Sequence, residues 1–144
     1  PMVELNVLRS PNREEHTRIA IYRERGYGNR GHREGPAYTQ VSIDASYSST
    51  LPDVRSRPPE TAPVSIEPHE PLRLRVFVDR SVVEVFVNGK QCIALRVYPG
   101  RDDSLGVSLR SQGKAAELRS LDAWQMKSIW ERSLPRDSRR LGME

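Results

Sequence analysis

Hydrophobic and polar residues alternate along much of the chain, and a period of two is typical of β-strands with one buried face. In the first part of the sequence, this alternation predicts strands over residues 3–7, 18–22 and 38–44. Residues 23–35 are rich in glycine and charge, which predicts a loop. Residues 46–63 contain four prolines and predict an irregular connection, because proline does not fit a central strand.

The second half alternates more regularly and carries the clearest turn signals. Valine, leucine or isoleucine recurs at every second position within residues 72–78, 82–87, 92–97 and 105–109. Asp79-Arg80 predicts a tight turn, and Asn88-Gly89 predicts a hairpin, because a type I′ turn needs positive φ at both central positions. The apolar positions change parity between Leu118 and Leu121, which predicts a last strand over 116–123 with a bulge near residues 119–120.

These segments together indicate the fold class. About seven short strands joined by turns, without a convincing helix, are typical of an antiparallel β-sandwich. The length of 144 residues fits one domain. We assign residues 1–130 to this sandwich and expect residues 131–144 to form a charged, flexible tail.

Composition and charge narrow the possible functions. No long uncharged apolar run is present, which excludes a transmembrane helix, and residues 2–8 do not form a signal peptide. The net charge of +4, spread over the whole chain, is only a weak argument for nucleic-acid binding. Residues 23–33 look like an arginine–glycine RNA-binding segment, but a single short occurrence favours a solvated loop. Cys92 is the only cysteine, so we expect no disulfide and interpret it as a small buried residue.

The acidic residues do not form an obvious catalytic or metal-binding pattern. Glu84 lies at a position opposite in parity to the valines of its strand, so we expect a solvated side chain paired with Arg75 or Arg96. Asp102 and Asp103 are adjacent in a loop and could bind calcium through their oxygen atoms. A role in a turn is favoured over a calcium-binding site, because the further acidic residues of the EF-hand pattern are missing.

Histidines and aromatic residues offer one candidate surface. The chain has three histidines, His16, His32 and His69, and their spacing is too scattered for a metal site. We predict neither a bound metal nor a cofactor. Tyr98 and Trp124 are candidates for a sugar-stacking platform, although core packing is the commoner role of tryptophan in a terminal strand.

Three phrases of the sequence resemble one family of enzymes. The C-terminal β-sandwich module of glycoside hydrolase family 32 is similar to three segments of this chain: LRLRVFVDRSVVEVFVNGKQCIALRVYP (72–99), DSLGVSL (103–109) and LRSLDAWQM (118–126). That family contains invertases, levanases, inulinases and fructosyltransferases. VSIDASYSS (41–49) is a looser match, with Ala45 where the family has arginine. The resemblance implies a concanavalin-like or lectin-like jelly roll that lacks its first strand.

The resemblance implies a module without catalytic residues. In this family an N-terminal five-bladed propeller carries the chemistry, in Asn-Asp-Pro, Arg-Asp-Pro and Glu-Cys phrases, and none of these phrases occurs here. Arg101-Asp102 is followed by Asp103 and not by proline. We therefore expect a domain that packs on and stabilises a propeller that cleaves sucrose or fructan. The family favours an extracellular or periplasmic location.

Two other functions stay open from the sequence. A free-standing lectin-like module would contact a fructan or another glycan through Tyr98, Asp102, Asp103 and Trp124. A structural module would form a homodimer through a free sheet edge.

We also expect structural roles for the turn residues. Asp79 and Ser81 would shape the first hairpin, Asn88 and Gly89 the second, and Asp122 with Trp124 would anchor the closing strand.

Overall fold

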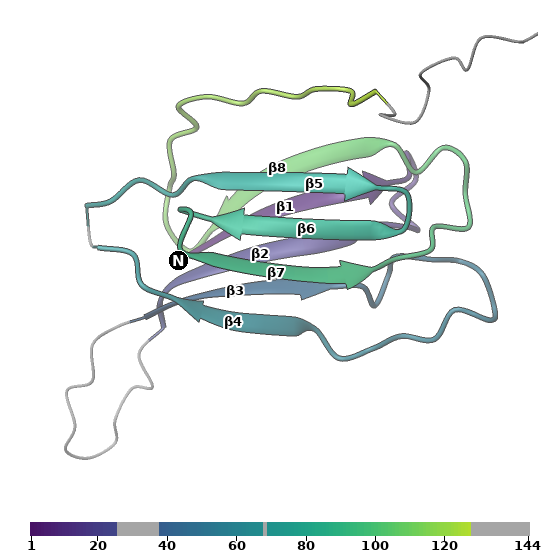
Figure 1. The fold of residues 1–144 in the computed structure, drawn as a ribbon, viewed down its shortest axis with the longest axis horizontal. Coiled ribbons are helices and arrows are strands. Elements are labelled where there is room, and N and C mark those ends of the chain that lie inside the picture. The colour runs from purple at the N-terminus through teal and green to yellow at the C-terminus, as the bar shows by residue number, and fades with distance from the viewer. Residues whose placement is uncertain (26–37, 68, 128–144) are drawn as a thin grey trace, which may run out of the picture.

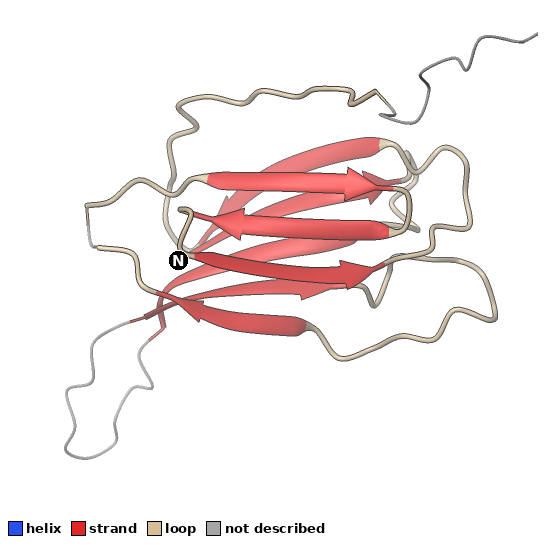
Figure 2. Ribbon diagram, in the orientation of Figure 1, coloured by secondary structure: helices blue, strands red, loops and turns tan. Residues whose placement is uncertain are grey.

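The computed structural model of the chain describes residues 1–25, 38–67 and 69–127. Within them it has eight strands and no helix (Figure 2). The strands are β1 (Met2–Arg9), β2 (Thr17–Arg25), β3 (Tyr38–Asp44), β4 (Glu60–Val64), β5 (Leu74–Asp79), β6 (Val82–Val87), β7 (Gln91–Arg96) and β8 (Gly106–Gln112). None of the described segments is therefore an apolar helix of membrane-spanning length.

The strands form two antiparallel sheets that lie face to face (Figure 1). One sheet has five strands in the order β4-β3-β2-β1-β8, and the other has three in the order β5-β6-β7. Every pairing between neighbours is antiparallel. The predicted antiparallel β-sandwich is thus confirmed.

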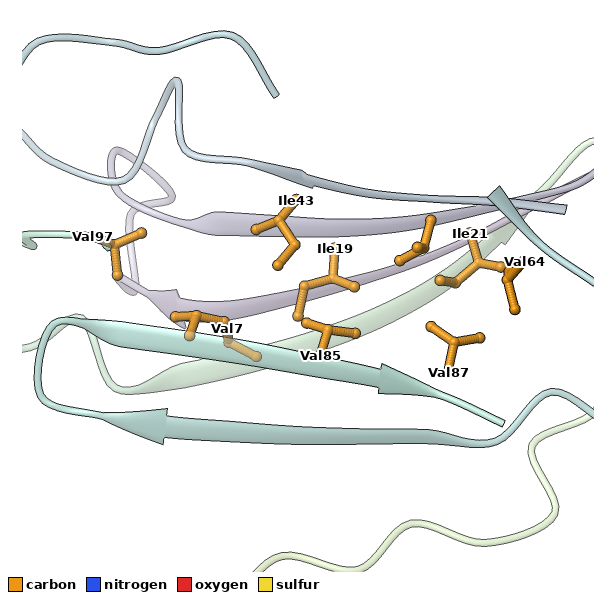
Figure 3. Close-up of a cluster of buried hydrophobic side chains, with 10 residues drawn as sticks. Val7, Ile19, Ile21, Ile43, Val64, Val85, Val87 and Val97 are labelled. Atoms are coloured by element: carbon orange, nitrogen blue, oxygen red, sulfur yellow. The ribbon is translucent and has the colours of Figure 1, made fainter. Parts of the chain in front are cut away.

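Aliphatic side chains from both sheets fill the space between them (Figure 3). Successive side chains of a strand point to opposite faces, so alternate apolar residues all reach the interior. Buried residues of the core are Val7, Ile19, Ile21, Val41, Ile43, Val64, Val83, Val85, Val87 and Val97. The alternation in the sequence therefore located the interior positions correctly.

Burial decreases towards one side of the sandwich, where β5 and β8 are the edge strands (Figure 1). The valines of β6 are fully buried, whereas Val78 on β5 and Leu109 on β8 are exposed. Leu109 pairs with Leu5 in the β1–β8 register and shares its interior face, yet Val107, two residues earlier, is 58% exposed. We name Val78, Val107 and Leu109 the open side of the sandwich.

The strand predicted over residues 116–123 is wrong. Residues 115–127 form no strand, and their large apolar side chains are exposed: Leu118, Leu121, Trp124 and Met126. A period-two pattern becomes a strand only where a neighbouring edge accepts its backbone hydrogen bonds. No described strand pairs with this segment, so its alternation is not realised, and Asp122 and Trp124 anchor no closing strand here.

Three other expectations need correction. The connection predicted over residues 46–63 contains part of β4, where Pro63 is tolerated because β4 is an edge strand. Cys92 is exposed, since Ile93 and Leu95 take the interior positions of β7. Glu84 is half-buried on the outer face of β6, and no ion pair joins it to an arginine in the described residues.

Both predicted hairpins are present. Arg80 has φ 51° in the β5–β6 turn. Asn88 and Gly89 have φ 52° and 67°, and the Lys90 N–H donates to the Val87 carbonyl over 3.0 Å. Positive φ at both central positions is the conformation of a type I′ turn.

The uneven burial predicts unequal effects of two truncations. Replacing Ile21, which is fully buried, with alanine should lower the free energy of unfolding of the chain by about 2–5 kcal/mol because it leaves a cavity. Val107→Ala on the open side should lower it by about 0.5 kcal/mol or less. Urea unfolding of both variants measures the difference, and equal losses would show that β8 is covered in the isolated chain.

Candidate functional site

One buried carboxylate, that of Glu15, ties three loops together at one end of the sandwich. Its Oε1 accepts hydrogen bonds from the backbone N (2.6 Å) and Oγ1 (2.8 Å) of Thr50 and from the backbone N of Gly100 (2.7 Å). Its Oε2 accepts from the backbone N of Arg101 (3.1 Å) and from Ser104 Oγ (2.6 Å). We name this arrangement the Glu15 cluster.

The local sequence places Glu15 by closing a tight loop between β1 and β2. The Ser10 N–H donates to the Glu15 carbonyl (2.9 Å), and the Glu15 N–H donates to Ser10 Oγ (3.0 Å). On the other side of the cluster, a Cβ added to Gly100 would lie 2.8 Å from Leu51 Cγ and 3.1 Å from Glu15 Oε1. A side chain at this position would displace Leu51, Thr50 or the Glu15 carboxylate, so glycine suits the close approach of the backbone.

Hydrogen bonding keeps the Glu15 carboxylate charged. Desolvation by burial is the largest single influence and raises its pKa. The donors of Ser104, Thr50 and Gly100 act in the opposite direction and together lower the pKa to about 2. Glu15 is therefore an ionised structural group at neutral pH.

The acidic pair predicted as a sugar-binding element lies next to this cluster. Asp103 forms a bidentate ion pair with Arg101, in which Arg101 Nε donates to Oδ1 (2.8 Å) and Arg101 Nη2 donates to Oδ2 (2.7 Å). The bond from Arg101 lowers the pKa of Asp103. Asp102 is exposed. No three potential metal ligands gather among the described residues.

The two predicted aromatic contacts lie in different segments of the chain. Tyr98, 46% exposed, lies in the same β7–β8 connection as Asp102 and Asp103. Trp124 is 79% exposed and lies in the irregular segment 115–127. In the described part of the chain no ring contact joins Trp124 to Tyr98. A platform shared by the four residues therefore stays a prediction.

A second hydrogen-bonded cluster surrounds the Asn88 turn. Asn88 Oδ1 accepts from the backbone N of Arg73 (2.8 Å), and Asn88 Nδ2 donates to Glu70 Oε1 (2.9 Å). Lys90 Nζ pairs with Glu70 Oε2 at 2.8 Å. The bonds from Lys90 and then Asn88 lower the pKa of Glu70 to about 2. These contacts hold the segment before β5 against the β6–β7 hairpin.

A third polar cluster, which the sequence gave no reason to single out, lies on the outer face of the five-stranded sheet. Glu4 is almost fully buried, and its Oε2 accepts from Arg18 Nε and Arg110 Nη2, each at 2.9 Å. Its Oε1 accepts from Asn6 Nδ2 at 2.9 Å. Desolvation raises the pKa of Glu4, but the bonds from Arg110 and Asn6 outweigh it and leave the pKa lowered.

Two predicted features cannot be placed. The tail at 131–144 and residues 26–33 of the arginine–glycine segment lie outside the described residues. The expectations for a flexible tail and for RNA contacts therefore stay predictions.

Comparison with known proteins identifies relatives of most of the chain. The family model "Glycosyl hydrolases family 32 C terminal" matches residues 2–125. The insoluble β-fructofuranosidase isoenzyme CWINV1 of Arabidopsis thaliana is 33% identical over an alignment of 131 residues, which covers 86% of this chain and 21% of the relative. The acid β-fructofuranosidase of Vicia faba is 33% identical over 140 residues, 94% of this chain and 21% of the relative.

A bacterial relative matches a shorter part. The levanase of Bacillus subtilis is 40% identical over 72 residues, which cover 49% of this chain and 10% of the relative. The chain therefore spans about a fifth or less of the length of these curated relatives.

The Glu15 cluster predicts a large effect of one isosteric substitution. Glu15→Gln places an amide NH₂ among five donors, so it should lower the free energy of unfolding at pH 7 by about 2 kcal/mol or more. The neighbouring Glu14→Gln is the matched control, because Glu14 is exposed and pairs only at the surface with Arg101. Its effect should be about 0.5 kcal/mol or less.

The lowered pKa of Glu15 also predicts a pH dependence. A carboxylate with a folded pKa of about 2 and an ordinary pKa of 4.5 stabilises the fold above pH 4.5, and this contribution is lost as the pH falls towards 2. Glu70 acts in the same direction. The stability difference between wild type and Glu15→Gln, measured by urea unfolding, should shrink from pH 5 to about pH 2. A constant difference would contradict the assignment.

Proposed function

The chain belongs to the C-terminal domains of family 32 glycosyl hydrolases, and from this we propose that it is the non-catalytic β-sandwich of a β-fructofuranosidase-like enzyme. In this proposal the sandwich packs on an N-terminal catalytic domain and stabilises it. The relatives are named β-fructofuranosidase and levanase, which supports sucrose or a fructan as the substrate class of the whole protein.

The observation that carries the packing role is the open side. Val107 and Leu109 point towards the interior of the sandwich but are exposed, because no strand of the three-stranded sheet covers β8. The irregular segment adds further exposed apolar side chains: Leu118, Leu121, Trp124 and Met126. Exposed apolar side chains in such number are typical of a protein interface, since covering them removes an unfavourable contact with water.

Three carboxylates that accept several hydrogen bonds support a non-catalytic role. Glycosidases of the usual mechanism need one carboxyl group with a raised pKa, so that it donates a proton near neutral pH. The pKa of Glu4, Glu15 and Glu70 is lowered instead, and all three accept several hydrogen bonds from protein groups. These residues are suited to hold loops and strands together.

Self-association is the second candidate, and the free edges favour it. β5 and β8 each have one neighbour within their sheets among the described strands, so their outer backbone groups are available to another strand. A homodimer formed through this edge would also cover the open side. Light scattering of the chain over a range of concentrations tests it, and a monomer at all concentrations would argue against it.

Glycan binding through Tyr98, Asp102, Asp103 and Trp124 has less support. Asp103 is engaged by Arg101, and Trp124 lies in a different segment from the other three. Retention of the chain on inulin or levan gels that is lost in Tyr98→Ala would favour it.

The packing role predicts how activity and stability depend on the rest of the enzyme. Purified residues 1–144 should release no fructose from sucrose, inulin or levan. In a protein that includes the catalytic domain, Val107→Asp should lower the thermal midpoint by several degrees, because it buries a charge in the interface. Cys92→Asp is the matched control, since Cys92 is exposed on β7, the strand at the opposite edge of the three-stranded sheet from β5.

Two results would contradict the proposal. One is turnover by residues 1–144 that survives repurification. The other is an equal shift of the midpoint in Val107→Asp and Cys92→Asp.

A further test is the mass of the native gene product. An immunoblot of the source cells with an antibody against this domain should show a band several-fold above 16.4 kDa, because the relatives are about five times longer than their matched parts. A band near 16.4 kDa alone would instead identify a free-standing sandwich.

A further inference from the structure

The outer face of the five-stranded sheet has a polar hollow that the packing role does not use. The three-stranded sheet covers only the opposite face (Figure 1). Side chains from four strands and two loops line a hollow of about 220 Å³: Glu4, His16, Arg18, Asp44, Tyr47 and Arg110. Strand register brings them together, because Arg18 is paired with Asp44 on β3 and Arg110 with Glu4 on β1.

The charges in the hollow balance. Arg18 and Arg110 contribute two positive charges, and Glu4 and Asp44 contribute two negative charges, so the sum is zero with neutral His16. Both guanidinium groups are already bonded to Glu4. A charged ligand would lose hydration without gaining a net opposite charge, whereas a neutral ligand with many hydroxyl groups avoids that cost.

The hydrogen-bonding groups are held in place before a ligand arrives. Glu4 fixes Arg18 and Arg110 through bonds of 2.9 Å, and the Ser46 N–H donates to Asp44 Oδ1 at 2.9 Å. The Arg110 side chain is 63% exposed, so its remaining N–H groups face solvent. Fixed donors and acceptors bind adjacent hydroxyl groups with little loss of side-chain entropy.

A flat aromatic surface completes the hollow. The rings of His16 and Tyr47 are stacked, with centroids 5.5 Å apart and planes 9° apart. The backbone N–H of His16 donates to the backbone carbonyl of Tyr47 over 2.7 Å, which links the β1–β2 and β3–β4 connections. Tyr47 is nevertheless 64% exposed. The electron-rich face of such a ring attracts the C–H groups on the flat side of a sugar.

We propose that this hollow binds one neutral sugar unit of an oligosaccharide. The sugar ring packs against Tyr47, and its hydroxyl groups bond to Arg18, Arg110 and Asp44. Its lining includes no residue of the open side and none of the β7–β8 connection that holds Tyr98, so the site is tested independently of the packing role.

Calorimetric titration of the full chain with an inulin-derived tetrasaccharide tests the site. We expect one sugar site per chain, with an affinity that changes less than about twofold between low and high salt, because no net charge is neutralised. Tyr47→Ala and Arg110→Ala should each weaken binding about tenfold or more. Tyr98→Ala is the matched control and should leave the affinity unchanged. Circular dichroism checks that each variant is folded.

Three outcomes would overturn the proposal. The first is no binding of the inulin tetrasaccharide or of a malto-tetrasaccharide at millimolar concentration. The second is binding of a heparin tetrasaccharide only, with a steep salt dependence, which would identify an anion site. The third is binding that Tyr98→Ala abolishes and Tyr47→Ala leaves intact. If Tyr47→Ala does not fold, Tyr47→Phe should retain binding while Arg110→Gln loses it, and the reverse pattern contradicts the site.

Discussion

The buried carboxylate of Glu15 is the constraint on which the arrangement of the two sheets depends. The chain crosses from the three-stranded sheet to the five-stranded sheet between β7 and β8, and Gly100, Arg101 and Ser104 in this crossing all donate to Glu15. Thr50 brings the β3–β4 connection to the same group. A charge without water is tolerated only where donors surround it, so the three loops and the carboxylate require one another.

The second constraint is the unequal number of strands. Five strands face three, and the interior is closed over β2, β3, β6 and β7 but open at β5 and β8. A sandwich with apolar residues on such an open side reaches its full stability only when another surface covers it. This links the geometry to membership in a family whose curated members are about five times longer than the part this chain matches.

Much of the fold could be predicted from the sequence, because strand alternation and turn residues are local signals. Seven of the eight strands in the described part of the chain and the turn at Asn88-Gly89 follow from them. β4 was missed because Pro63 argues against a strand unless its edge position is known. The prediction of a closing strand over residues 116–123 is wrong, because a strand forms only where a neighbouring sheet edge accepts its backbone hydrogen bonds. The Glu15 cluster could not be predicted, because the donors to its carboxylate lie 35 to 89 residues away in the sequence and no local pattern indicates such contacts.

The central claim is that the open side is an interface with the rest of the enzyme. Amide hydrogen exchange tests it most directly, because exchange reports the local covering of each strand. We predict that β5, β8 and residues 115–127 exchange much more slowly in a protein that includes the catalytic domain than in residues 1–144 alone, while β2 and β3 change little. Equal exchange of β5 and β8 in the two forms would contradict the account.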